Sequence, residues 1–270
     1  FTKRLFKKNL VHLFRRKFWN LNYKNKQPVE KFFNLPFGNL LVRLNEDVGG
    51  NIYSENIHEI AETNFLQKNV EKNWCCIDIG ANIGYFSLLL ANKAVNGKVI
   101  AIEPIEKNVE IISKTLLKNA VDNVHIEAAA IDSVDGNREF SVLEDSAYSG
   151  FISTGRKELK ETVTVRTISP DSLVQKYSLS KIDLIKIDVE GSEMPIFKSF
   201  KDVIMQMKPK YILSECNETN MKNYGFKAEE LLVLLDSYGY EPNFLSDEGE
   251  LYNFDKNQLS LLDNIIFTIK

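Results

Sequence analysis

Glycines and acidic side chains surround the end of an apolar strand predicted at residues 75–79. The segment IDIGANIGYF, residues 77–86, runs from that strand into a helix and places Gly80 and Gly84 in the turn. Glycines permit a tight turn and a close approach of backbone to a ligand, and a helix N-terminus presents free N–H groups. The G-x-x-x-G spacing differs from that of dinucleotide sites, and the Gly-Lys-Ser/Thr of a Walker loop is missing.

Two carboxylates give this turn a chemical preference. Asp78 lies two residues before Gly80, where its charge would repel a pyrophosphate and attract an ammonium or sulfonium group. Glu103 ends the next predicted strand, at the position where an acid can take both ribose hydroxyls. Together with Gly84, these residues favour an adenosine-type ligand that carries positive charge over NAD. The alternative is that they are ordinary turn glycines and a solvated strand-end acid.

A second group of ionisable residues follows a later apolar strand, in the segment IDLIKIDVEGSE at 182–193. Because strand side chains alternate between faces, Lys186, Asp188 and Glu190 are predicted to share one face. Such groups are costly to bury unless they are paired or used in chemistry. Glu215 ends the next strand, so carboxylates of neighbouring strand ends converge on one rim. A structural ion pair of Lys186 and Asp188, with Glu190 capping the next helix, is the alternative.

These motifs need a sheet that brings strand ends together. From Trp74 onward, short β-branched segments alternate with amphipathic stretches, which predicts an α/β fold with a mostly parallel, doubly wound sheet and helices on both faces. Ligands of such sheets bind at the carboxyl ends of the strands. The predicted strands are 75–79, 98–103, 124–127, 182–188, 211–215 and 265–269, with a β excursion at 138–142 and 162–167. The hydroxyl-rich segment 142–155 is either a substrate lid or a surface loop.

The N-terminal residues differ in charge from the rest of the 270-residue chain. Nine Lys and Arg residues and no acid precede Glu30, so the first 29 residues carry +9 and the remaining 241 carry −12. Near-helical spacing of apolar residues predicts a basic amphipathic helix over 1–27, ended by Pro28. A hairpin at 31–43 and a helix at 59–70 follow. We divide the chain into this helix (1–28), a hairpin and helix extension (29–72) and an α/β domain (73–270).

Composition excludes several classes of protein. With 44% hydrophobic and 26% charged residues, the chain is neither disordered nor collagenous. No apolar run approaches the roughly 18 residues that cross a bilayer. Three cysteines, two of them adjacent, suit buried thiols in a reducing compartment, and no secretory signal is visible, so we expect a cytoplasmic protein. Because Phe1 rather than Met opens the chain, we expect it to be part of a larger multidomain enzyme.

The motifs DIGANIG (78–84), Glu103-Pro104 and DLIKIDVEGSE (183–193) resemble the FkbM family of S-adenosylmethionine-dependent methyltransferases, over about residues 51–270. The resemblance implies a class I Rossmann-like fold, S-adenosylmethionine as cofactor and O-methylation, often of a sugar or polyketide hydroxyl. It matches the cofactor residues Asp78, Gly80, Asn82, Gly84 and Glu103, and the strand-end residues Lys186, Asp188, Glu190, Glu193 and Glu215. Glu59 resembles an upstream family acid, although His58 precedes it where an aromatic residue is usual. Ala130 and Asp188 complete the cofactor-binding residues that we expect.

Methyl transfer to a hydroxyl needs aligned reactants and removal of a proton. We expect Asp188, Glu190 and Glu215 to supply the base, with Lys186 as an electrostatic orienter and a saccharide or other small hydroxylated molecule as acceptor. An Asp/Asn-Pro-Pro-Tyr signature of N-methylation is absent. Alternatively, Asp188, Glu215 and Asn217 offer an all-oxygen site for Mg²⁺, which we do not favour.

Two other functions compete with this one. An NAD-type oxidoreductase is disfavoured by the glycine spacing and by Asp78. A non-catalytic module would use the basic N-terminus to bind nucleic acid or membrane, but phosphates would repel a body of −12, so we expect no nucleic-acid partner. For the basic helix we expect docking on the body or on a preceding domain, ahead of peripheral contact with an anionic membrane through residues 1–27.

Overall fold

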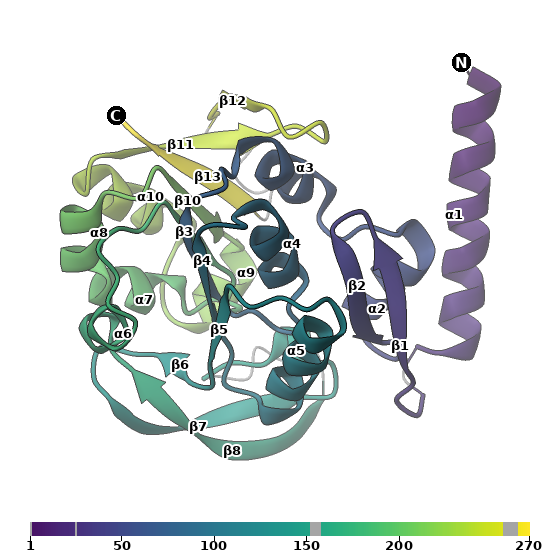
Figure 1. Ribbon diagram of the computed structural model, residues 1–270, viewed down its shortest axis with the longest axis horizontal. Helices are drawn as coiled ribbons and strands as arrows, with labels where there is room; N and C mark the ends of the chain where they lie inside the picture. Colours follow the sequence, from purple (N-terminus) through teal and green to yellow (C-terminus); the bar gives the residue numbers. More distant parts are fainter. Residues whose placement is uncertain (1, 25, 152–157, 256–263) are drawn as a thin grey trace.

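An eight-stranded sheet forms the centre of the computed structural model, which describes residues 2–24, 26–151, 158–255 and 264–270 (Figure 1). Its strands run in the order β12 (Leu251–Asn253), β11 (Tyr240–Leu245), β13 (Asn264–Ile269), β10 (Tyr211–Glu215), β9 (Leu184–Ile187), β3 (Cys75–Ile79), β4 (Lys98–Ile102) and β5 (Val124–Glu127). The strands from β10 to β5 are parallel, whereas β13 is antiparallel to both of its neighbours. The predicted mostly parallel sheet is therefore confirmed.

Helices cover both faces of this sheet, so its central parallel strands are buried on both sides. In β3, Ile77 packs into one apolar cluster and Cys76 into the other. The first cluster takes side chains from α6 (Pro170–Lys176), α7 (Glu193–Ser199), α8 (Lys201–Met207), α9 (Glu218–Asn223) and α10 (Ala228–Ser237). The second takes them from α3 (Ile60–Asn69), α4 (Tyr85–Lys93) and α5 (Glu106–Lys118). The sheet thus has the doubly wound arrangement that the sequence predicts.

The boundaries of the predicted strands agree closely with the structure, with one instructive exception. The strands at 75–79, 124–127 and 211–215 coincide with β3, β5 and β10. The strand predicted at 182–188 is shorter, because β9 covers only Leu184–Ile187 and the chain leaves the sheet at Asp188. The sequence analysis missed β11 and β12, since Pro242 lies within β11 and proline cannot donate to a strand ladder.

The predicted β excursion is a separate three-stranded sheet. It consists of β6 (Ala130–Ile131), β8 (Leu159–Ile168) and β7 (Gly136–Leu143), in that order. Between β7 and β8, the short 3-10 helix η1 (Ser146–Tyr148) leads into residues that face the carboxyl end of the central sheet. Residues 152–155 of the candidate lid lie outside the described residues.

The N-terminal extension begins with the expected hairpin, formed by β1 (Glu30–Leu35) and β2 (Gly38–Arg43). It continues with α2 (Asp47–Glu55), which the sequence analysis missed because glycines at 49 and 50 disfavour a helix. Both glycines are needed for packing. A Cβ on Gly49 would lie 2.0 Å from the carbonyl oxygen of Arg43, and one on Gly50 would lie 2.5 Å from the ring of Trp19.

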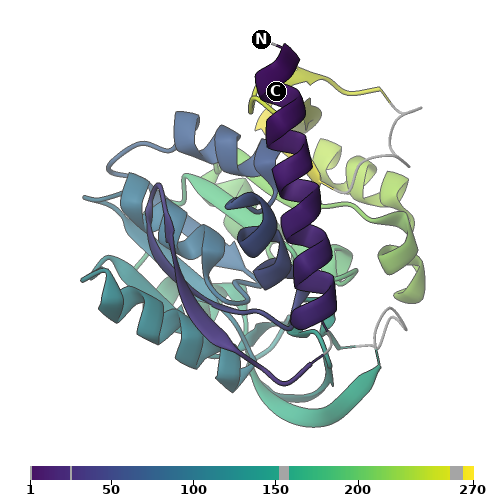
Figure 2. The same cartoon turned by 90° about the vertical axis from the view of Figure 1, so that its right-hand side faces the viewer.

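The basic helix α1 (Thr2–Asn22) lies alongside α2 on the outside of the molecule (Figures 1 and 2). Trp19 is fully buried, and its indole N–H donates to the carbonyl oxygen of Leu44 at 2.6 Å. Arg16 donates to the Oδ1 of Asn51 at 2.8 Å, and its guanidinium lies over the Trp19 ring. One side of α1 is therefore fixed to α2 by a buried aromatic ring and polar contacts.

Two further sequence expectations can be compared with the fold, and a third, the domain boundary, cannot. Cys75, Cys76 and Cys216 are buried free thiols, as expected. Within the described part of the chain, no helix combines the length and the apolar character that crossing a membrane requires. The domain boundary at residue 72 stays a prediction, and the hairpin and α3 share an apolar cluster with α4 and the central sheet.

We expect Gly50→Ala to displace helix α1. An Ala in a helix interior is about 1 kcal/mol more favourable than Gly, but here the new methyl group would collide with the rigid ring of Trp19, and overpacking costs about 1–3 kcal/mol. Emission of Trp19, recorded in a Trp74→Phe background, should shift to longer wavelength as the ring enters water. Gly136→Ala is the matched control, because its Cβ would meet only Thr167 Oγ1 at 3.7 Å. An unshifted emission in Gly50→Ala would contradict the packing described.

Candidate active site

A cavity of about 400 Å³ lies at the carboxyl ends of the central strands, where parallel sheets bind their ligands. The turn after β3, the end of β4 and residues 129–131 after β5 form one part of its wall, and the ends of β9 and β10 form another. Segment 146–151, α2 and the residues before α3 complete it. Of the predicted site residues, Glu59, Gly80, Asn82, Glu103, Ala130, Lys186, Asp188, Glu190 and Glu215 line this cavity.

The turn after β3 is held tightly between its neighbouring strands. Gly80 has a φ of +78°, and a Cβ there would lie 1.9 Å from the carbonyl oxygen of Asp188. The backbone N–H groups of Gly80 and Ala81 both donate to the carbonyl oxygen of Ile102 at 3.0 Å. Gly84, with a φ of +81°, precedes α4 and lies behind the cavity wall. Glycine at position 80 therefore lets the end of β9 approach the turn.

Glu103 is buried at the end of β4 and anchors the turn. Its carboxylate accepts hydrogen bonds from the backbone N–H of Asn82 at 2.8 Å and of Ile105 at 2.9 Å, and from the side chain of Asn108 at 3.1 Å. Burial raises the pKa of Glu103 to about 7, although these donors act in the opposite direction. A carboxylate accepts about four hydrogen bonds, so Glu103 can take a further donor from a ligand in the cavity.

Asp78 lies beneath the cavity rather than in its wall. It is 1% exposed, and its Oδ2 accepts a hydrogen bond from Ser87 Oγ at 2.6 Å. Burial raises the pKa of Asp78, while Lys186 on the adjacent strand β9 lowers it. Asp78 can therefore act on a ligand only through Lys186 and the local electrostatic field, and not by the direct contact with a cation that its position in sequence suggested.

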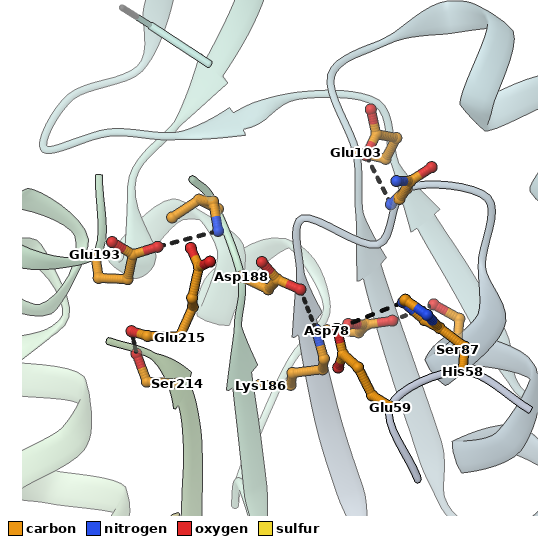
Figure 3. Close-up of polar contacts among 12 residues, drawn as sticks. His58, Glu59, Asp78, Ser87, Glu103, Lys186, Asp188, Glu193, Ser214 and Glu215 are labelled. Atoms are coloured by element: carbon orange, nitrogen blue, oxygen red, sulfur yellow. Dashed lines mark hydrogen bonds and ion pairs between the residues drawn. The ribbon is translucent and has the colours of Figure 1, made fainter. Parts of the chain in front are cut away.

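Lys186 is a buried cation between acidic side chains (Figure 3). Its Nζ lies 3.0 Å from Asp188 Oδ2 and 4.6 Å from the centre of the Phe86 ring. Burial opposes its charge, but Asp188, Glu59 and Asp78 together raise the pKa of Lys186 above its usual value. The ammonium group therefore stays charged, and the expected pairing of Lys186 with Asp188 is present.

Three carboxylates lie close together at this point, and one of them, Asp188, belongs to the ion pair; we call them the acid trio. Asp188, Glu190 and Glu215 each place one oxygen within 4.8 Å of the others. The amide of Asn220 donates to Glu190 Oε2 at 2.8 Å and to Glu215 Oε1 at 3.3 Å. Burial and the neighbouring acids Asp188 and Glu190 raise the pKa of Glu215 well above its usual value. This group of side chains can hold a proton or a cation.

The route by which Glu190 reaches this group differs from our expectation. Strand alternation predicts that Lys186, Asp188 and Glu190 share a face, but β9 ends at Ile187. Glu190 lies in the following loop with a φ of 56°, and Gly191 follows it with a φ of 104°. The turn brings Glu190 back toward Glu215, so loop geometry rather than the pleat places this carboxylate.

Two other residues named in the sequence analysis, Glu193 and Asn217, use side-chain oxygens to bind backbone N–H groups. Glu193 is fully buried, and its Oε1 accepts hydrogen bonds from the backbone N–H groups of Val189 and Gly191, each at 3.2 Å. Asn217 belonged to the possible Mg²⁺ site, but its Oδ1 accepts from the N–H groups of Thr219 and Asn220 and caps α9. Asn217 is therefore a helix cap, and the oxygen-bearing side chains that lie together are those of Asp188, Glu190 and Glu215.

Residues of α2 form a part of the wall that sequence analysis missed, whereas segment 146–151, which also lines the cavity, falls in the candidate lid. Asp47, Val48 and Asn51 of α2 line the cavity, and Asn51 Nδ2 lies 3.3 Å from His58 Nδ1. Burial lowers the pKa of His58 to about 4, so its imidazole is neutral near pH 7. No motif in the sequence marks α2, whereas the hydroxyl-rich composition of 142–155 did indicate a segment at the site.

Glu46 connects this wall to segment 146–151 from outside the cavity. It lies 3.1 Å from Arg43 Nε and accepts a hydrogen bond from Ser146 Oγ at 3.0 Å. Burial raises the pKa of Glu46 from 4.5 to about 7, although Arg43 opposes the shift. The carboxyl group therefore binds a proton more tightly in the folded protein than in the unfolded chain.

We expect this carboxyl group to make stability depend on pH. Between pH 4.5 and about 7 the folded state holds a proton that the unfolded state has lost, so the free energy of unfolding falls as pH rises through this range. Glu46→Gln should make that slope less negative by up to about 1.4 kcal/mol per pH unit, measured by urea unfolding. Glu139→Gln, at an exposed acid, is the control. Equal slopes in Glu46→Gln and the unsubstituted protein would rule out this role.

Comparisons with known proteins agree with the motifs. The profile of the methyltransferase FkbM domain matches residues 78–242. The AMB antimetabolite synthetase AmbE of Pseudomonas aeruginosa is 24% identical over 208 residues, which cover 63% of this chain and 10% of that protein. Methyltransferase sdnD of Sordaria araneosa is 26% identical over 54% of this chain and 65% of its own length. The hexuronic acid methyltransferase AglP of Haloferax volcanii is 25% identical over 53% of this chain and 56% of its own.

The match therefore spans less than two thirds of each of these relatives' own lengths, and a tenth of the first. The domain profile nevertheless includes the turn after β3, Glu103, Lys186 and the acid trio, which line the cavity at the ends of β3, β4, β9 and β10. Because the domain profile covers more than half of the 270 residues, the chain belongs to the FkbM family of S-adenosylmethionine-dependent methyltransferases.

Proposed function

We propose that this protein transfers a methyl group from S-adenosylmethionine to a hydroxyl group of a saccharide or another small hydroxylated acceptor. The observation that carries the proposal is that one cavity joins the Glu103 turn to the acid trio of Asp188, Glu190 and Glu215. Acidic walls suit a sulfonium donor and a neutral acceptor. AglP is named a hexuronic acid methyltransferase, which adds support for a saccharide acceptor. Because a hexuronic acid has a carboxyl group, that name supports the saccharide class and not the absence of charge.

The cofactor half of the proposal rests on the turn after β3. Glu103 has room for a ribose hydroxyl as donor, and Gly80, Asn82 and Ala130 line the adjacent wall. The charged Lys186 suits a carboxylate, and Glu59 and Asp188 suit an ammonium group. When bound, S-adenosylmethionine supplies an electrophilic methyl group on a positively charged sulfur. These residues would hold it by matching hydrogen-bond donors to acceptors and cations to carboxylates.

The acceptor half rests on the acid trio. An alcohol that attacks a methyl group must lose its proton, and a carboxylate of raised pKa, when ionised, is a stronger base than an ordinary carboxylate. Glu215 has such a pKa, and Glu190 shares the Asn220 amide with it. Lys186 holds Asp188 in place through their 3.0 Å contact. We therefore assign Glu215, with Glu190, as the base, and Asp188 and Lys186 as the groups that orient the reactants.

The cofactor assignment predicts that Glu103→Gln weakens binding of S-adenosylmethionine by about 10-fold or more, because a hydrogen bond to a charged group contributes about 1.5–3 kcal/mol. Isothermal titration calorimetry on variants with an unchanged melting transition measures this effect. Glu106→Gln, at an exposed acid in the first turn of α5, is the control. Binding of NADH without binding of S-adenosylmethionine would instead support an oxidoreductase and refute the proposal.

The acceptor assignment predicts that Glu215→Gln and Glu190→Gln each reduce turnover by about 10²-fold or more, the usual contribution of a general base. Methyl-labelled S-adenosylmethionine is incubated with neutral saccharides and nucleotide-sugar extracts, and mass spectrometry identifies the methylated product. Glu229→Gln, at an exposed acid on α10, should retain full turnover.

Full turnover in both Glu190→Gln and Glu215→Gln would show that our base assignment is wrong. Loss of turnover with EDTA, restored by Mg²⁺, would also contradict it, because the trio would then hold a cation in place of the proton. The absence of any methylated product in a protein that binds S-adenosylmethionine would contradict the acceptor class and leave the cofactor assignment intact.

A further inference from the structure

Helix α1 turns its apolar side away from the protein. His12, Arg16 and Trp19 contact α2, whereas Leu13, Phe14 and Leu21 are 70%, 73% and 65% exposed. Val11 and Phe18 are exposed as well. In Figure 2 the helix runs along the outside of the molecule, in front of the other elements. The face that contacts the body is thus partly polar, and the large apolar side chains point outward, opposite to the usual arrangement of a surface helix.

The same helix carries an unusual charge. Its residues Thr2–Asn22 include seven Lys and Arg and no Asp or Glu, and Lys24 and Lys26 follow it. Lys17 is exposed and lies four residues after Leu13 and four before Leu21, so it shares their side of the helix. Cations and large apolar side chains are therefore mixed on one exposed face.

This mixture identifies the kind of surface that the helix fits. The centre of a protein–protein interface is depleted in lysine, because burial would remove the charge from water. At a lipid surface, a lysine stem lies along the apolar region while its ammonium group reaches the phosphates. In the described part of the chain no helix is apolar enough to cross a membrane, so α1 would lie in the plane of the interface.

We propose that the outer face of α1, formed by Val11, Leu13, Phe14, Lys17, Phe18 and Leu21, binds an anionic membrane surface with the helix axis parallel to the membrane. The apolar side chains enter the boundary between headgroups and acyl chains, and the ammonium group of Lys17 contacts lipid phosphates. The body from Glu30 onward carries −12, so the same surface repels it. Attraction of the helix and repulsion of the body together fix which side of the protein faces the lipid.

Contacts on the inner side of α1 make this orientation relevant to the cavity. Arg16 donates to Asn51, and Asn51 lines the cavity and contacts His58. Trp19, fully buried, fixes the helix to the segment between β2 and α2. Through these contacts of Arg16 and Trp19, a membrane-bound α1 would hold the cavity at a set orientation to the lipid surface.

Co-sedimentation of the full 270-residue chain with vesicles tests the proposal. We expect binding to vesicles of mixed phosphatidylcholine and phosphatidylglycerol, weaker binding in high salt, and little binding to phosphatidylcholine alone. The double variant Leu13→Glu/Phe14→Glu should bind at least about 10-fold more weakly, because binding scales with buried apolar area. Lys17→Glu should also weaken binding to the anionic vesicles.

Matched controls separate this face from exposed apolar residues in general. Leu117→Glu on α5 and Val233→Glu on α10 replace side chains that are 84% and 70% exposed, and both should bind like the unsubstituted protein. Equal binding of Leu13→Glu/Phe14→Glu and the unsubstituted protein would overturn the proposal, as would failure to bind anionic vesicles or equal binding to both kinds of vesicle. A dimer in light scattering that the double variant converts to a monomer, without vesicle binding, would show that a second copy of this chain covers the face instead.

Discussion

The centre of this structure depends on the interaction of the buried Lys186 ammonium group with the carboxylates of Asp78 and Asp188. Lys186 and Asp78 are register partners on the two central strands β9 and β3, and both are almost completely buried. Transfer of an isolated ion from water into a protein costs several kcal/mol, so each of these groups needs the other and Asp188 nearby. A slip of one residue between the strands would turn Lys186 toward the opposite apolar cluster, where Ile185 and Ile187 lie. The electrostatic attraction between Lys186 and Asp78, which are register partners on the two strands, therefore favours one register of the sheet and, with it, one arrangement of strand ends.

The surrounding acids respond to burial in a different way. Lys186 can balance only part of the negative charge around the cavity, and burial raises the pKa of Glu103 and of Glu215. Protonation and hydrogen bonds take up the remainder, through donors such as the Asn82 N–H and the Asn220 amide. A site built in this way is acidic yet not fully ionised near neutral pH. Such a site suits a cationic methyl donor and a neutral acceptor, and the carboxyl groups that are ionised are stronger bases than ordinary carboxylates, which suits removal of a proton from a hydroxyl.

The sequence allows prediction of those parts of the fold and site that local patterns determine. Apolar runs such as 75–79 and 211–215 are buried parallel strands, and Gly80 and Glu103 follow such strands at positions that topology assigns to ligands. Helix α2 was missed because its glycines oppose helix propensity, and their value appears only when Trp19 and Arg43 pack against them. Glu190 was assigned to the right cavity for the wrong reason, since the strand ends three residues earlier and the loop turns the carboxylate inward. Long-range packing decides such features, and no local pattern records it.

The family profile covers one part of the cavity wall and not the other. The profile match begins at residue 78 and includes the cavity residues at the ends of β3, β4, β9 and β10, whereas Asp47, Asn51, His58 and Glu59 precede it. These N-terminal residues belong to an extension that shares an apolar cluster with α4 and is fixed in turn by Trp19 of α1. The matched region consequently includes the turn after β3 and the acid trio, whereas the N-terminal part of the wall lies outside it. Because that wall closes the same cavity, the extension can change the shape available to an acceptor while the chemistry at the strand ends stays the same.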